Sequence, residues 1–285
     1  MRKEIWKDTI FKAFSTLLLF AILGPLTTGH TVALDDEPSE QVEIDSIEDL
    51  QAMRENLDGN YVLVSDIDAS ETENWNDGSG FDPIGGEDFP FTGSIDGQGH
   101  TISNLYSDRR DKNNVGLFWA IGVQNEVGTV ENLDLENVRV IGGKWVGALA
   151  GAVNKGVLSG CCSTGKVKGN RLVGGLIGHS GGFLGNSCSS AEVDGEWDVG
   201  GLVGALGGDL DTSHSDGSVT GDTYVGGLVG KVVDSGTISA CFSTASVEGT
   251  RRKIGGLAGF NEGEIANSYS VGTVAGSESK GGGLV

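Results

Sequence analysis

Val199-Gly-Gly-Leu-Val-Gly204 decides the fold, because the chain repeats this stretch along much of its 285 residues. Similar copies start at Val146, Val173, Val225 and Ile254. Successive starts lie 27, 26, 26 and 29 residues apart, and a looser copy, Val115-Gly-Leu-Phe118, starts 31 residues before the first of them. Such a period is typical of a solenoid, in which each repeat buries its apolar face by stacking on its neighbours.

Each copy also contains a second block of short apolar runs, such as Gly156-Val-Leu158 and Val167-Lys-Gly169. Three short runs per copy, separated by glycines, leave no segment long enough for a helix. We therefore predict an all-β fold, a right-handed parallel β-helix (solenoid) of roughly six coils that pair at about 4.8 Å. The glycines are expected to form turns with positive φ and to let the coils approach closely.

Aligning the copies predicts which side chains fill the interior. Two columns should point inward: Leu158, Leu184, Leu210, Ile238 and Ile265, and then Val167, Val193, Val219, Val247 and Val274. A third column, Cys161, Ser187, Ser213, Cys241 and Ser268, should also face inward. Asn132, Asn186 and Asn267 share a bend, where their amides could bond between coils.

Residues 42–114 are expected to form an N-terminal cap and the first coils, ahead of the repeats at 115–285. Ser46 and Asp49 have the spacing that satisfies free N–H groups at a helix start. Apolar residues then recur at helical spacing, and Gly59 is placed to end this short capping helix. A strand at Tyr61-Val-Leu-Val64 follows. Such a helix covers the open end of a solenoid core.

Residues 1–33 have the features of a secretory signal peptide. Arg2, Lys3 and Lys7 precede an apolar run too short to span a bilayer, and Thr31-Val-Ala33 offers a cleavage site. Residues 34–41 should form a flexible acidic mature terminus. We predict a secreted or cell-surface protein with no membrane insertion after cleavage. The last residues resemble the start of another copy, so the chain is expected to be truncated within a repeat.

The charge of the chain limits its partners. With 40 acidic and 19 basic residues the net charge is −21, which disfavours nucleic acid because phosphate binding needs clustered Lys and Arg. No HExxH zinc motif is present, and we predict no catalytic residue, no metal site and no cofactor. Acidic pairs such as Asp66 with Asp68 and Asp209 with Asp211 could serve a carbohydrate-active enzyme or bind calcium. Solvated surface is the interpretation we favour for them, as for Asp96 and Asp216.

An outward column should contain Cys162, Cys188, His214, Phe242 and Tyr269. Cys162 and Cys188 lie one coil apart, which places them within reach of a disulfide, and an exported protein permits one. Cys161 and Cys241 lie three coils apart, too far to bridge. His214, Phe242 and Tyr269 could form a stacking ridge that binds a glycan or a host or cell-surface protein.

The repeat resembles the GLUG motif, which is clear in Ile254-Gly-Gly-Leu-Ala-Gly259 followed by Gly263-Glu-Ile-Ala-Asn-Ser-Tyr-Ser-Val-Gly272. The segments Tyr61–Asp68 and Phe91–Leu105 resemble the entry segment that usually precedes this motif. The resemblance covers residues 42–285. GLUG repeats occur in adhesin-like surface proteins and in the non-catalytic regions of bacterial IgA-cleaving proteases. The resemblance therefore implies a β-solenoid and an extracellular place, and it transfers no catalytic residue.

These patterns favour a non-catalytic extracellular module that acts in adhesion or as a rigid spacer. Two alternatives stay open. One is a carbohydrate-active β-helix enzyme with clustered carboxylates. The other is an accessory segment of a larger secreted protease.

Overall fold

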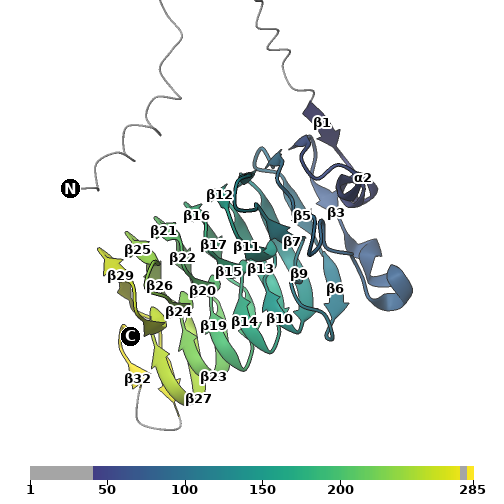
Figure 1. The fold of residues 1–285 in the computed structure, drawn as a ribbon. Coiled ribbons are helices and arrows are strands. Elements are labelled where there is room, and N and C mark those ends of the chain that lie inside the picture. The colour runs from purple at the N-terminus through teal and green to yellow at the C-terminus, as the bar shows by residue number, and fades with distance from the viewer. Residues whose placement is uncertain (1–40, 277–280) are drawn as a thin grey trace, which may run out of the picture. The chain divides into compact units, whose positions relative to one another are not determined.

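The computed structural model describes residues 41–276 and 281–285, which form a parallel β-solenoid (Figure 1). Every pairing between its named strands is parallel, because each strand bonds to the equivalent strands of the coils before and after it. Three sheets of nine, seventeen and six strands run along the stack. The prediction of a repetitive parallel β-helix is confirmed.

The nine-stranded sheet begins at the capped end. Its strands are β1 (Gln41–Ile44), β2 (Asn60–Leu63), β4 (Ser94–Asp96), β8 (Gly128–Glu131), β12 (Gly156–Ser159), β16 (Phe183–Gly185), β21 (Asp209–Asp211), β25 (Thr237–Ser239) and β29 (Glu264–Ala266). The six-stranded sheet contains one strand from each of six successive turns. Its strands are β7 (Phe118–Ile121), β11 (Ala150–Val153), β15 (Ile177–Ser180), β20 (Val203–Leu206), β24 (Val229–Val232) and β28 (Ala258–Asn261).

The seventeen-stranded sheet is continuous because its long strands turn a corner and pair on both sides of it. The long strands are β9 (Asp134–Gly142), β13 (Cys162–Lys168), β23 (Ser218–Gly226) and β27 (Ser246–Gly255). The short ones are β3 (Ile67–Asp68), β5 (Thr101–Ser103), β6 (Tyr106–Arg109), β10 (Lys144–Val146), β14 (Arg171–Gly174), β17 (Cys188–Ser189), β18 (Glu192–Asp194), β19 (Trp197–Gly200), β22 (His214–Ser215), β26 (Phe242–Ser243), β30 (Tyr269–Ser270), β31 (Val274–Gly276) and β32 (Gly281–Gly282).

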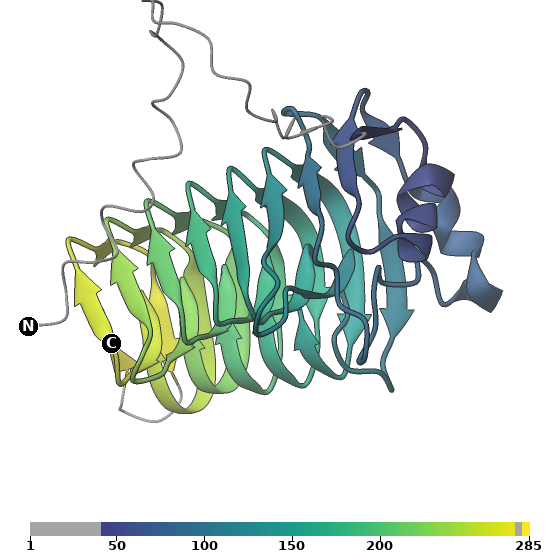
Figure 2. The ribbon, with the colours of Figure 1, turned by 45° about the horizontal axis from the view of Figure 1, so that its top comes forward.

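A short helix, α2 (Ile47–Ala52), lies at the N-terminal end of the stack (Figure 2). The Ser46 side chain accepts a hydrogen bond from the Asp49 N–H, as the spacing predicted, and Ile47 and Leu50 are buried. The helix tightens into the 3₁₀ turn η1 (Met53–Glu55), so it ends before Gly59. The 3₁₀ turns η2 (Ser70–Asn74) and η3 (Asn76–Gly78) follow.

The predicted inward columns form one core that continues through the coils. Leu158, Leu184 and Leu210 are fully buried and pair in register, as do the valines of the second column. In the last coil Ile265 and Val274 are only partly buried, because a described coil covers them on one side alone. Each coil therefore buries its apolar face against its neighbours.

Both roles predicted for the glycines are found in the structure. They do allow close approach: a β-carbon at Gly201 would lie 2.0 Å from the Gly227 carbonyl oxygen, and one at Gly204 would lie 2.5 Å from the Leu172 backbone. Positive φ occurs at some glycines, among them Gly122, Gly160 and Gly165, and also on the residue before the Val-Gly or Ile-Gly that opens each repeat. That position has φ between 53° and 58° in Trp145, Leu172, Asp198, Tyr224 and Lys253.

Several other predictions have clear outcomes. Asn132 and Asn186 do occupy a left-handed bend, and their amides donate to Asp96 and Ser159 of the preceding coil. Gln41, predicted to lie in the flexible terminus, belongs to β1. The predicted signal peptide at 1–33 and the rest of that terminus lie outside the described residues.

Candidate functional site

The predicted outward column exists as one ladder. Cys162 pairs with Cys188, Cys188 with His214, His214 with Phe242, and Phe242 with Tyr269, all in parallel register. Because side chains at paired positions point the same way, five coils present these residues on one face.

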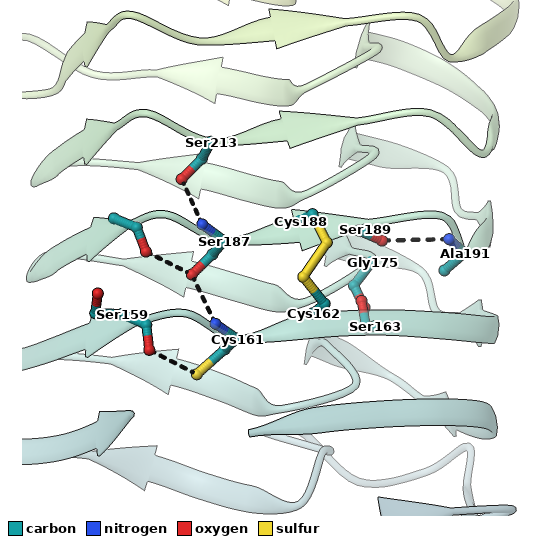
Figure 3. Close-up of a disulfide and its surroundings, with 11 residues drawn as sticks. Ser159, Cys161, Cys162, Ser163, Gly175, Ser187, Cys188, Ser189, Ala191 and Ser213 are labelled. Carbon is teal, nitrogen blue, oxygen red and sulfur yellow. Dashed lines mark hydrogen bonds between the residues drawn. A yellow bond between two sulfur atoms is a disulfide. The ribbon is translucent and has the colours of Figure 1, made fainter. Parts of the chain in front are cut away.

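Cys162 and Cys188 are joined by a disulfide between successive coils (Figure 3). Their Sγ atoms are 2.04 Å apart and their Cα atoms 4.5 Å apart. The bond links β13 to β17 next to the position where the ladder continues into His214. It therefore ties together two coils directly beside the aromatic residues.

The two other cysteines, Cys161 and Cys241, directly precede Cys162 and Phe242 in the sequence and lie in an inward column. Both are free thiols and both are buried, and their N–H groups bond to the hydroxyls of Ser187 and Ser268 in the next coil. Burial raises the pKa of Cys161 to about 12 and that of Cys241 to about 11. Since the thiolate is the reactive form, these thiols are poor nucleophiles at neutral pH.

His214, Phe242 and Tyr269 form a parallel stack of rings, which we call the aromatic ridge. The ring centroids of His214 and Phe242 are 4.7 Å apart with 6° between the planes, and those of Phe242 and Tyr269 are 5.4 Å apart with 9° between them. His214 and Phe242 are half-buried, whereas Tyr269 is 54% exposed. The ridge is a row of aromatic rings at the surface, and its binding role stays a prediction.

The acidic residues considered for catalysis or calcium bond to neighbouring protein groups. Asp68 accepts from the Ser70 N–H and from the Asn104 amide, and these bonds lower its pKa. The Thr101 N–H, and then His100, lower the pKa of Asp66 in the same way. Asp209 and Asp211 point outward from β21, and Asp209 accepts from the Thr237 hydroxyl. Within the described ranges, no group of three His, Cys, Asp or Glu side chains is placed to hold a metal ion.

Two aromatic clusters escaped the sequence analysis, and both use the left-handed bend before Val-Gly-Gly. In one, the Tyr224 and Phe260 rings stack with centroids 5.2 Å apart, and the Lys253 ammonium lies 3.3 Å from the Phe260 centroid. The other cluster lines a groove of about 660 Å³ and includes Trp119, Trp145 and His179. Aligning the residues beside the motif, as well as the motif itself, would have revealed both.

A further groove, of about 580 Å³, gathers positive charge from successive coils. Arg110, Arg139, Lys166 and Lys168 line it together with Asp111, Glu192 and Asp194. Lys166 and Lys168 pair with Glu192 and Asp194 of the next coil. Exposed pairs of this kind contribute at most about 1 kcal/mol each. They largely neutralise the groove and serve to join neighbouring coils.

Residues 35–165 match the family described as the M26 IgA1-specific metallo-endopeptidase N-terminal region. The match bears out the link to the non-catalytic region of IgA-cleaving proteases, while the GLUG name remains a resemblance carried by the repeat residues. The matched segment contains the capping helix, the two tryptophans of the groove and Cys162, and it ends before the aromatic ridge.

Two individual proteins are similar to this chain. The chain is 49% identical over 149 residues to Halomucin of Haloquadratum walsbyi, a match that covers 50% of this chain and 2% of that protein. It superimposes with a TM-score of 0.66 on the crystal structure of a "putative immunoglobulin A1 protease" from Bacteroides ovatus. That match covers 83% of this chain and 78% of the other at 21% identity, so it shows a shared fold. Over residues 41–276 and 281–285, no helix is long and apolar enough to cross a bilayer.

Proposed function

We propose that this chain is a non-catalytic extracellular accessory module, which acts as a rigid spacer and presents the aromatic ridge to a glycan or to a host or cell-surface protein. The observation that carries the spacer role is the core that continues from coil to coil. The columns of Leu158 and Val167 keep the same register and burial in successive coils. Bending such a stack would open packed interfaces, so it behaves as a stiff rod.

The family match supports the accessory part of this proposal. Residues 35–165 match the N-terminal region of a metallo-endopeptidase family, and a region of that kind can position other parts of a protein. The extracellular place rests on the same relationship and on the predicted signal peptide. It is tested by protease accessibility on intact cells, where degradation of the protein is expected and full protection would contradict the proposal.

The adhesive part rests on the geometry of the ridge. Three rings held parallel by strand register present a preformed apolar edge, and little side-chain entropy is lost when a partner docks on it. A partner can contact the outermost ring directly because Tyr269 is 54% exposed. Pyranose rings also have apolar C–H faces that pack on aromatic rings.

The test is a screen of the purified chain against glycans and against cell-surface protein extracts, with every glycan binder assayed for new reducing ends. Binding that the combined His214→Ala, Phe242→Ala and Tyr269→Ala substitutions abolish would support adhesion. The control combines Phe89→Ala with Phe183→Ala, since these rings are 72% and 38% exposed and lie outside the ridge. Release of reducing ends by the chain would contradict the non-catalytic role.

A further inference from the structure

We propose that a second site, the groove lined by Trp119, Trp145 and His179, binds a neutral glycan chain. This groove, which we call the tryptophan groove, has a volume of about 660 Å³, and its other lining residues are Glu87, Asp111, Lys112, Asn113, Asn114, Ala152 and Asn154. It lies on β7, β11 and β15 of the six-stranded sheet and on β10 of the seventeen-stranded sheet, whereas the aromatic ridge lies on β22, β26 and β30. The proposal is therefore independent of ligand binding at the ridge.

The hollow exists because small residues occupy one column of the six-stranded sheet. Ala120, Ala152 and His179 stand at paired positions in successive coils, and Ala205, Lys231 and Phe260 continue the column. Ala152 is 5% exposed, so the floor of the groove lies close to the backbone. The larger His179 closes one side. The groove is thus a depression built into the coils.

The backbone holds the two indoles in place. Trp145 has φ 56°, a left-handed conformation that a bulky side chain adopts only when the surroundings impose it. Gly151 and Gly178 leave room for it here, because a β-carbon on either would lie within 2.8 Å of the Trp145 backbone. Trp119 lies on β7, where its N–H donates to Ile84 and its carbonyl accepts from the Asn114 amide. Both indoles are half-buried and are placed before any ligand arrives.

The polar groups around the indoles suit hydroxyl groups better than a charged or purely apolar ligand. Two carboxylates and one ammonium, from Glu87, Asp111 and Lys112, stand at the rim with the amides of Asn113 and Asn154. Burial lowers the pKa of His179, so its imidazole is neutral at physiological pH and can donate one hydrogen bond and accept another. Indole faces receive the C–H faces of a pyranose ring, and amides and carboxylates bond to its hydroxyls.

Charge decides which glycans fit. The chain has a net charge of −21, and the groove itself adds two negative groups against one positive group. An acidic polysaccharide would be repelled during approach and would lose hydration of its carboxylates without gaining a cationic partner. We therefore assign the groove to neutral sugars and exclude uronic acid or sulfated chains.

The experiment is titration calorimetry of the whole chain with neutral hexasaccharides of glucose, mannose, N-acetylglucosamine and xylose, and with a galacturonic acid hexasaccharide as the acidic probe. At least one neutral probe is expected to bind with a millimolar or lower Kd, and the acidic probe is expected not to bind. Trp119→Ala and Trp145→Ala should each weaken binding about tenfold, as truncation of an aromatic anchor does. Trp197→Ala is the matched control, because this indole is 42% exposed on β19 and lies outside the groove, and it should change Kd less than about twofold.

Three outcomes would overturn the proposal: no neutral probe binds, only the acidic probe binds, or binding survives both tryptophan substitutions. The combined ridge substitutions separate the two sites. Binding that they remove and the tryptophan substitutions spare would support the ridge and reject the groove. If an alanine variant fails to fold, Trp119→Phe and Trp145→Phe keep an aromatic face and should retain more affinity than Trp145→Leu, which keeps bulk without a ring.

Discussion

Removing the disulfide between Cys162 and Cys188 should destabilise the chain without changing its coil stacking. The bond closes a loop with a sequence separation of 26 residues. In the chain-entropy account, opening such a loop lets the unfolded chain gain conformational entropy, which lowers the free energy of unfolding by about 3.5 kcal/mol. The native contacts remain, because the two residues also pair as neighbouring strands. For a folded unit of this size, that loss corresponds to a fall in Tm of roughly 10 °C.

The assay compares thermal unfolding of the parent chain with the Cys162→Ser, Cys188→Ser double variant. Reductant should lower the Tm of the parent towards that of the variant and leave the variant unchanged, which is the internal control. Alkylation under denaturing, non-reducing conditions gives an independent count of thiols. We expect labels on Cys161 and Cys241 alone, since these are the free cysteines. Four labels, or equal Tm values for parent and variant, would refute the reasoning.

Three further predictions concern single side chains. Burial lowers the pKa of His179 in the folded state, so as the pH falls through the unfolded value of about 6.5 the unfolded chain takes up the proton first. The free energy of unfolding should therefore fall with pH below that value. In a series of Tm measurements from pH 8 to pH 5.5, His179→Gln should reduce this fall. Gly201→Ala should cost more than about 2 kcal/mol in denaturant unfolding, because its β-carbon would meet the Gly227 carbonyl, whereas Gly86→Ala, with open space around it, should be close to neutral. Phe242→Ala removes two ring contacts worth about 0.5–1.5 kcal/mol each, and the free energy of unfolding should fall accordingly. Phe89→Ala is the control, because the Phe89 ring is 72% exposed. If Phe242→Ala lowers the free energy of unfolding no more than Phe89→Ala, the ridge does not stabilise the fold.

The repeat period made the columns predictable, and with them most of the fold. Once copies are aligned, parallel stacking places residues of one column directly above one another, so Cys162 and Cys188 could be paired from the sequence alone. The same alignment placed His214 beside Phe242. Register in this fold follows from counting residues, because each coil repeats the path of the one before it.

The corners of the coil could not be predicted in this way. We expected positive φ at glycine, where it carries no steric cost, and Gly160 and Gly165 have it, but so do Trp145, Leu172 and Tyr224. Many other glycines lie where backbones pass too closely for a β-carbon. The backbone preferences of single residues could not predict these positions, because the close backbone contacts that require glycine exist only in the folded coil.

The tryptophan groove shows where a repeat sequence carries information about binding. Positions that stay aliphatic in every copy, such as the column of Leu158, report the core, because a polar side chain there would lie unpaired against two neighbouring coils. Positions that face outward are free to differ in size and charge from copy to copy. The column that reads Ala152, His179, Ala205, Lys231 and Phe260 is of this kind. Its changes of size create a hollow beside Trp145 in one coil and a stacked ring beside Tyr224 in another. Recognition in such a solenoid is therefore expected where the copies disagree, at outward positions that adjoin a glycine-braced bend.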